Sequence, residues 1–259
     1  MRRPNMNKLE LSAVPGIPEI AAGDDLAKIV FDAAAAAGIS CVEGDIFVVA
    51  QKVVSKAESR TVRLHDVRPS AEAERLAAIA DKDPRVVELI LGESKCVIRC
   101  VRGVIIVEHR LGFVMANAGI DASNVAAPGG DETVLLLPAN PDASAARLRD
   151  SLSKAWGVGI GIVINDSFGR AWRMGTTGTA IGVAGLPALI DLRGLPDRNG
   201  RNLVATEIGV ADELAGAASL LMGQAAEGQP VVHARGFPYA ASPGTAKDLV
   251  RAPKMDLFR

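Results

Sequence analysis

The chain has 259 residues, of which 49% are hydrophobic and 23% charged, and its formal net charge is −1. This balance is typical of a globular protein, and the near-zero charge with 3% aromatic residues argues against nucleic acid as a partner. No apolar run reaches the roughly 20 residues that cross a bilayer, so we expect no membrane partner. The three cysteines lack metal-site spacing, which is typical of buried reduced thiols in a cytoplasmic protein.

Hydrophobic periodicity and turn residues in the first half predict alternating strands and helices. These elements are a strand over 9–14, a helix over 24–37, a buried strand over 46–50, a helical region over 70–92 broken at Pro84, and a hairpin of 96–101 with 104–107. Asp24 and Asp25 are candidate N-caps of the first helix, and Gly38 is placed to end it.

Polar side chains follow the buried strand over 46–50. Gln51, Lys52, Ser55 and Lys56 come directly after it, and the two ammonium groups are able to bind phosphate. The alternative is a solvated loop, which is where lysines usually lie.

A short segment further on is rich in oxygen ligands. Asn117, Asp121, Ser123 and Asn124 lie close together in the sequence, before a Gly/Pro/acidic loop over 125–134. If Asp121 and a second aspartate meet in the fold, the two carboxylates can hold one or two cations.

The second half contains fewer predicted elements. They are a helix over 140–156 with Asn140 as N-cap and Pro141 at its first position, an apolar strand beginning at Val158, a helix over 206–222 and a strand over 231–234. The glycine-rich segment over 175–200 is assigned no element, and 236–259 is predicted to be a peripheral tail.

The strand that begins at Val158 is predicted to end on a polar cluster. The cluster contains Asn165, Asp166, Ser167, Gly169, Arg170 and Arg173. Asp and Ser are hard oxygen ligands for Mg²⁺ or Mn²⁺, whereas Arg suits phosphate or carboxylate, so the pattern indicates a metal–phosphate substrate such as a nucleotide. The alternative is a turn in which Asp166 caps the next segment.

Known nucleotide and hydrolase motifs do not explain this pattern. The chain has neither a P-loop nor a dinucleotide fingerprint after a strand, so a bound nucleotide requires an unusual scaffold. His65, His109 and His233 are scattered and no nucleophile elbow is present, which leaves triad hydrolysis and zinc-protease chemistry without support.

Several motifs together resemble the coenzyme F420-0:L-glutamate ligase family. They are Gly44-Asp-Ile-Phe-Val-Val-Ala-Gln-Lys-Val-Val-Ser-Lys56, Ala116-Asn-Ala-Gly-Ile-Asp-Ala-Ser-Asn124, Asn165-Asp-Ser-Phe-Gly-Arg170, Ala211-Asp-Glu-Leu-Ala215 and Leu221-Met-Gly-Gln224. The resemblance runs from about residue 9 to 236, in order and with similar spacing. No single motif is specific by itself.

The resemblance implies a mixed α/β (α+β) fold of an unusual kind, neither Rossmann nor P-loop, that assembles as an intertwined homodimer. It implies one domain over 1–259, with a core of about 9–236 and a peripheral tail over 237–259. The implied activity is a GTP-dependent ligase of coenzyme F420 biosynthesis. It adds L-glutamate to coenzyme F420-0 through γ-linked amide bonds by way of an acyl phosphate, with Mg²⁺ or Mn²⁺ at two sites and K⁺ as a further candidate.

The resemblance also assigns site residues. The first metal ion is expected at Asp121 and Asp166, and the second at Ser167 and Gln224. The expected nucleotide contacts are Ile17, Pro18, Glu19, Ile20, Gln51, Lys52, Lys56, Asn124, Met222, Gly223, Gln224, Ala225, Ala226, Glu227, Gly228 and Gln229. Ser167 stands where threonine is frequent, and Gln224 where some relatives carry glutamate, which removes a negative charge from the second metal site.

Our own hypothesis adds catalytic roles to Asp166, Arg170 and Arg173, with the arginines contacting phosphate or substrate carboxylate. Two other functions stay open from the sequence. One is an NTP-dependent amide ligase that acts on a different carboxylic acid. The other is a non-catalytic protein that binds a nucleotide or coenzyme. Two metal carboxylates favour an enzyme, because a binding module would not need them.

Overall fold

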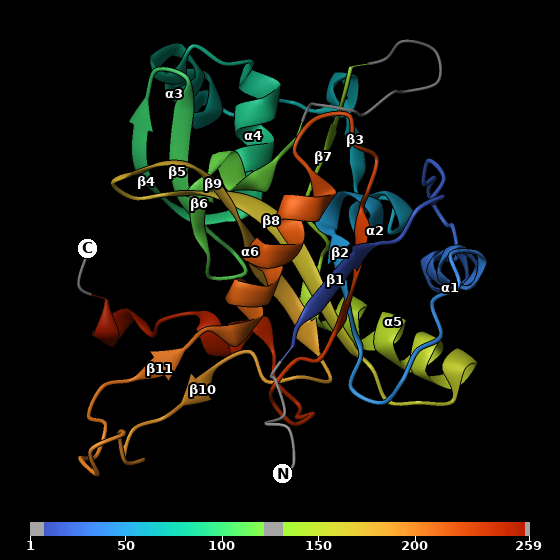
Figure 1. The fold of residues 1–259 in the computed structure, drawn as a ribbon. Coiled ribbons are helices and arrows are strands. Elements are labelled where there is room, and N and C mark those ends of the chain that lie inside the picture. Colours follow the sequence, from blue (N-terminus) through green and yellow to red (C-terminus); the bar gives the residue numbers. More distant parts are fainter. Residues whose placement is uncertain (1–7, 122–131, 257–259) are drawn as a thin grey trace, which may run out of the picture.

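The computed structural model describes residues 8–121 and 132–256, and a five-stranded sheet forms its centre (Figure 1). The strands, in spatial order, are β1 (Glu10–Ala13), β12 (Val231–Arg235), β2 (Ile46–Ala50), β8 (Gly161–Arg170) and β9 (Arg173–Ala184). Only β2 and β8 run parallel, and the other neighbours are antiparallel. Helices and several sheets together confirm the mixed α/β class, whereas the homodimer stays a prediction.

Helices cover both faces of the central sheet. The side chains of β2 are apolar on both faces, so burying them requires a helix layer on each side. Phe47 and Val49 pack against helices α1 (Leu26–Ala36) and α5 (Pro141–Trp156), whereas Ile46 and Val48 pack against α6 (Val210–Met222) on the opposite face. This period of two, without polar positions, is the pattern of a strand buried on both faces.

Three smaller sheets complete the strands. They are β4 (Ser94–Val101) with β5 (Val104–His109) and β6 (Val114–Ala116), then β3 (Thr61–Arg63) with β7 (Thr133–Leu135), and β10 (Ile190–Asp191) with β11 (Glu207–Ile208). Helices α3 (Ala71–Ala80) and α4 (Pro84–Gly92) pack on the three-stranded sheet and enclose an apolar cluster of their own. The predicted hairpin and the break at Pro84 are confirmed.

Helix boundaries follow the capping residues that the sequence displays. Asp25 accepts a hydrogen bond from the backbone N–H of Lys28, and Asn140 accepts one from that of Ala143. Gly157 adopts a left-handed conformation after Trp156 and ends α5. Among the described residues, no helix combines the length and the apolar character that a membrane span requires.

One alternative is excluded and one local expectation is wrong. The residues after β2 form helix α2 (Gln51–Ala57), which excludes the alternative of a solvated loop. The strand that begins near Val158 does not end at the polar cluster, because β8 continues to Arg170 and pairs with β9. Strand β9 covers the first part of the glycine-rich segment, to which the sequence assigned no element.

Glycines in β9 allow the helices to approach the sheet closely. A Cβ atom at Gly178 would lie 2.3 Å from the carbonyl oxygen of Ala215 in α6, and one at Gly182 would lie 2.5 Å from that of Pro141 in α5. A side chain in either place would push backbone away, which explains why a strand can be so rich in glycine.

Replacing Gly178 by alanine is therefore expected to lower the free energy of unfolding by about 1–3 kcal/mol, because α6 must move away from β9. Gly169→Ala in the neighbouring strand is the matched control, since a Cβ there meets no heavy atom within 4 Å. Urea unfolding followed by circular dichroism measures both variants. Equal stability of the two would show that the close approach does not constrain the fold.

The middle of the segment that follows β12 packs against the rest of the protein. The 3₁₀ turn η3 (Ala246–Leu249) buries Ala246, whose N–H donates to the carboxylate of Asp142 at 2.8 Å. A second 3₁₀ turn, η4, covers Pro253–Met255.

Candidate active site

A cavity of about 380 Å³ lies where the parallel strands β2 and β8 reach their carboxyl ends. Four segments of the chain line it, namely the turn over 17–20, the start of α2, residues 165–167 of β8 and the loop that joins α6 to β12. The carboxyl ends of adjacent parallel strands meet at one edge of a sheet, which is a usual place for a ligand site.

The cavity brings together most of the residues that the sequence analysis singled out. Its lining includes Ile17, Pro18, Glu19, Ile20, Gln51, Lys52, Lys56, Asp166, Ser167, Met222, Gly223, Gln224, Ala225, Ala226, Gly228 and Gln229. Four other described candidates, Asp121, Arg170, Arg173 and Glu227, are not part of this lining. Asn124 lies outside the described residues.

Helix α2 presents both lysines to the cavity, because Lys52 and Lys56 are four residues apart and so share one helix face. The adjacent face of the helix is buried, and there the Ser55 hydroxyl donates to Gln51 Oε1 at 3.0 Å. Each ammonium group is ion-paired with a carboxylate: Lys52 Nζ lies 2.5 Å from Asp121 Oδ2, and Lys56 pairs with Glu19. The side chain of Lys56 is only 16% exposed.

Asp166 lies inside β8 and therefore does not cap a following helix or turn. Burial, with a smaller contribution from the negative charge of Asp121, raises the pKa of its carboxyl to about 6. The backbone N–H of Ser167 and the ammonium of Lys52 act in the opposite direction. The Ser167 N–H donates to Asp166 Oδ1 at 2.8 Å. A half-buried carboxylate that is destabilised by another carboxylate would be stabilised by a cation.

The donor chemistry of this region fits divalent metal ions. Asp121 and Asp166 supply carboxylate oxygens, Ser167 a hydroxyl and Gln224 an amide oxygen, and these are the ligand types that Mg²⁺ and Mn²⁺ prefer. The mutual repulsion of the two aspartates is the structural observation that supports a cation there. These four residues would be the ones to hold the ions.

The two arginines of the polar cluster lie elsewhere. Arg170 and Arg173 are exposed where β8 turns into β9, and Arg170 donates to the carbonyl of Met174 at 2.9 Å. Because β8 extends beyond Asp166, this turn is carried away from the cavity lining. Their catalytic role stays a prediction that a ligand-bound state must test.

Asn165 is a cavity residue to which the sequence analysis gave no role. It is only 5% exposed, and its side-chain Nδ2 donates to Ser219 Oγ at 3.0 Å and to Met222 Sδ at 3.4 Å. The one signal in the sequence was its place beside Asp166 in an otherwise apolar strand. Neither partner on α6 can be identified from local sequence.

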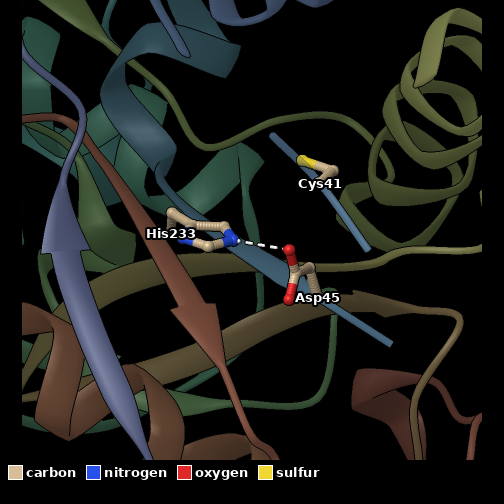
Figure 2. Close-up of side chains that lie close together, drawn as sticks. All are labelled: Cys41, Asp45 and His233. Atoms are coloured by element: carbon tan, nitrogen blue, oxygen red, sulfur yellow. Dashed lines mark hydrogen bonds and ion pairs between the residues drawn. The ribbon is translucent and has the colours of Figure 1, made fainter. Parts of the chain in front are cut away.

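A second cluster of chemically reactive side chains lies at the other end of β2 (Figure 2). One ligand atom each from Cys41, Asp45 and His233 lies within 4.8 Å of the others. Asp45 is already saturated, because its carboxylate accepts from the Val42 N–H at 3.0 Å, from His233 Nε2 at 2.9 Å and from two nitrogens of Arg235 at 2.9 and 2.5 Å.

The thiol of Cys41 is poorly suited to bind a metal ion. Burial raises the pKa of Cys41 to about 12, with a contribution from the charge of Asp45, whereas a metal ligand must be a thiolate. We therefore interpret the cluster as an anchor that joins β12 to the start of β2.

The sequence matches the family described as F420-0:Gamma-glutamyl ligase over residues 16–236. It is 45% identical over 253 residues to the coenzyme F420:L-glutamate ligase of Methanothermobacter thermautotrophicus strain Delta H. The matched region covers 97% of this chain and 99% of the relative. The enzyme of the same name from Methanopyrus kandleri is 43% identical over 255 residues (97% and 98%), and that from Halorubrum lacusprofundi is 44% identical over 243 residues (92% and 91%).

Proposed function

Because this chain belongs to the F420-0:gamma-glutamyl ligase family, we propose that it adds L-glutamate to coenzyme F420-0 through γ-linked amide bonds in coenzyme F420 biosynthesis. The proposal includes GTP as co-substrate and divalent metal ions as cofactors. Near full-length similarity to relatives with this printed name supports the ligase activity. The composition of the cavity supports the choice of a metal-bound nucleotide.

One observation carries the chemical part of the proposal. The same cavity is lined by two lysines from α2 and by Asp166 and Ser167 from β8. The ammonium groups suit phosphate oxygens, and the oxygen ligands suit the cation that accompanies a nucleotide.

The reaction begins with a carboxylate on the acceptor, which is a poor acyl donor until it is activated. Transfer of the γ-phosphoryl group of GTP to that carboxylate forms an acyl phosphate and GDP. The amine of glutamate then attacks the acyl carbon, the bond to the phosphate oxygen breaks, and an amide and inorganic phosphate result. Bound metal ions would neutralise charge on the phosphates during this transfer.

The lysines of α2 would bind the phosphates, although each is paired with a carboxylate in the structure. Lys52 contacts Asp121, which is itself a candidate metal ligand. With Asp121 bound to a metal ion, the Lys52 ammonium would become available for a phosphate oxygen. Lys56 would likewise exchange Glu19 for phosphate, so nucleotide and metal binding are expected to support each other.

The test of the proposed function is a mass-spectrometric assay with coenzyme F420-0, L-glutamate, GTP and Mg²⁺ or Mn²⁺. Products heavier by one or more glutamyl residues would support the ligase, and their number would count the glutamates added. GTP hydrolysis or binding without such products would instead favour an amide ligase for another carboxylic acid. The absence of both would contradict the proposal.

Replacing Lys56 by glutamine is expected to raise the KM for GTP by about 10- to 100-fold, because a charge-assisted hydrogen bond to phosphate is lost. Lys28→Gln on α1 is the matched control, since Lys28 also pairs with a carboxylate but lies on the surface. Steady-state kinetics at saturating glutamate measures both variants. An unchanged KM for GTP in the Lys56 variant would remove this residue from the nucleotide site.

A further inference from the structure

Some buried polar atoms of the protein have no hydrogen-bond partner, and two of them belong to residues of the cavity. Among the described residues, four buried side-chain atoms have no hydrogen-bond partner, and they are His109 Nε2, Arg149 Nε, Asn165 Oδ1 and Gln229 Oε1. The two that can only accept a hydrogen bond, on Asn165 and Gln229, both belong to residues that line the same cavity. A buried acceptor without a donor is costly, so a ligand group that donates to it is the simplest explanation.

The orientation of the Asn165 amide is determined by its neighbours. A thioether sulfur can only accept a hydrogen bond, so the amide nitrogen and not the oxygen must face Met222 Sδ at 3.4 Å. The same nitrogen donates to Ser219 Oγ at 3.0 Å. The oxygen is therefore the atom left for a ligand.

The cavity has two chemically different sides. Lys52 and Lys56 on α2 are cations, which suit phosphate. The lone pairs of Asn165 and Gln229, on the side formed by β8 and the loop before β12, repel phosphate and attract an N–H donor or a cation. The divalent metal ions already have candidate ligands in Asp121, Asp166, Ser167 and Gln224, so an N–H donor is the group that we assign to these two oxygens.

We propose that Asn165 binds the amine of the amino-acid substrate, with Gln229 as a second acceptor in the same cavity, in place of the nucleotide contact that the resemblance implies for Gln229. This inference rests on the proposed function, because it assigns the amine of that reaction. Asn165 and Asp166 both line this cavity, so an amine held by Asn165 is in the same cavity as the expected site of phosphoryl transfer.

Asn165 acts by position and not as a base. The amine nitrogen forms the new bond to the acyl carbon, the carbon–oxygen bond to phosphate breaks, and the proton released by the nitrogen passes to the departing phosphate. A neutral amide accepts a hydrogen bond throughout and takes no proton. The expected loss on its removal is therefore mainly in the binding of glutamate.

The decisive variant is Asn165→Leu, which removes the acceptor and keeps a similar volume. We expect the KM for L-glutamate to rise by about 10- to 100-fold, while the Kd for GTP and the Mn²⁺ dependence stay within about twofold of the original protein. Asn199→Leu, the same change at an exposed loop asparagine, is the matched control and is expected to alter none of these values. Gln229→Met tests the second acceptor and is expected to raise the same KM.

Hydroxylamine separates this inference from the proposed function. It is a small amine that traps an acyl phosphate as a hydroxamate without a binding site for glutamate. We expect the Asn165 variant to form hydroxamate at nearly the original rate while its glutamyl transfer falls. Unfolding temperatures measured alongside report any separate loss of stability, because leucine also removes the hydrogen bonds that the Asn165 amide donates to Ser219 Oγ and Met222 Sδ.

Three results would overturn the assignment. One is an unchanged KM for glutamate in both variants, and another is a weakened affinity for GTP or Mn²⁺ in place of glutamate. The third is a loss of hydroxamate formation together with glutamyl transfer in the Asn165 variant, which would place the residue in the first step. If the unaltered protein forms neither product, the proposed function fails first and this inference fails with it.

Discussion

Replacing Asp166 by asparagine is expected to lower glutamyl transfer by at least about 100-fold. The variant keeps the size of the side chain and removes the charge that would hold a metal ion beside the phosphates. The mass-spectrometric assay described above measures the loss. A variant with nearly full activity at saturating metal and GTP would contradict the assignment of Asp166 to the metal site.

The same substitution is expected to stabilise the metal-free protein by about 3 kcal/mol at pH 7. Burial raises the folded-state pKa of Asp166 from 3.8 to about 6, so the folded protein binds more protons than the unfolded chain between these values. Stability of the original protein therefore falls as pH rises from about 4 to 6, and it does so less in the asparagine variant. The difference in unfolding free energy should be near zero at pH 4 and largest above pH 6.

Asp212→Asn is the control for the two effects expected of Asp166→Asn, the loss of activity and the gain of stability. Burial also raises the pKa of Asp212, whose carboxylate accepts from the N–H of Ala180 at 2.8 Å, but Asp212 does not line the cavity. This variant should gain stability and keep its activity. Urea unfolding with a chelator present, at pH 4 and pH 7, compares all three proteins. A less stable Asp166 variant at pH 7 would show that the carboxylate is not destabilised in the fold.

Replacing Asp45 by asparagine is expected to lower the free energy of unfolding by about 3–5 kcal/mol. Asp45 is 1% exposed, and its carboxylate accepts from Arg235, His233 and the Val42 N–H. Without the charge of Asp45, the guanidinium of Arg235 loses its ion-pair partner at the junction of β12 and β2 and keeps its hydrogen bond to the Ser40 carbonyl. Activity measured well below the unfolding temperature should change little, since this junction lies at the opposite end of β2 from the cavity.

The pH dependence of this effect has the opposite sign to that of Asp166. Burial by itself would raise the pKa of Asp45, but hydrogen bonds from Arg235, Val42 and His233 lower it below the ordinary 3.8. Stability from Asp45 is therefore complete above about pH 4 and lost as pH falls through the folded pKa. Acid unfolding followed by fluorescence should show this loss in the original protein and not in Asp45→Asn.

The matched control for Asp45 is Asp150→Asn on α5, where an exposed aspartate pairs with Arg149. Exposed pairs contribute little, so its unfolding free energy should stay within about 0.5 kcal/mol. If Asp45→Asn were equally mild, the cluster would not anchor β12, and a role for it in binding a metal ion would need to be reconsidered.

Local sequence determined much of this protein. Caps and periodicity placed α1 and α5 correctly because a helix end depends on a few adjacent residues such as Asp25, Asn140 and Gly157. The apolar run of β2 showed where its strand ends, and the motifs identified residues such as Lys56 and Asp166 before their positions in space were known.

Tertiary structure alone decided the rest, because the deciding contacts join distant segments. Gly178 suits a strand only since α6 packs against it, and β8 continues through its polar cluster only since β9 pairs with it. That pairing also carries Arg170 away from the cavity lining. Asn165 shows a free acceptor only because Met222, 57 residues later, orients its amide. No local pattern records such partners, since they become neighbours only when the chain folds.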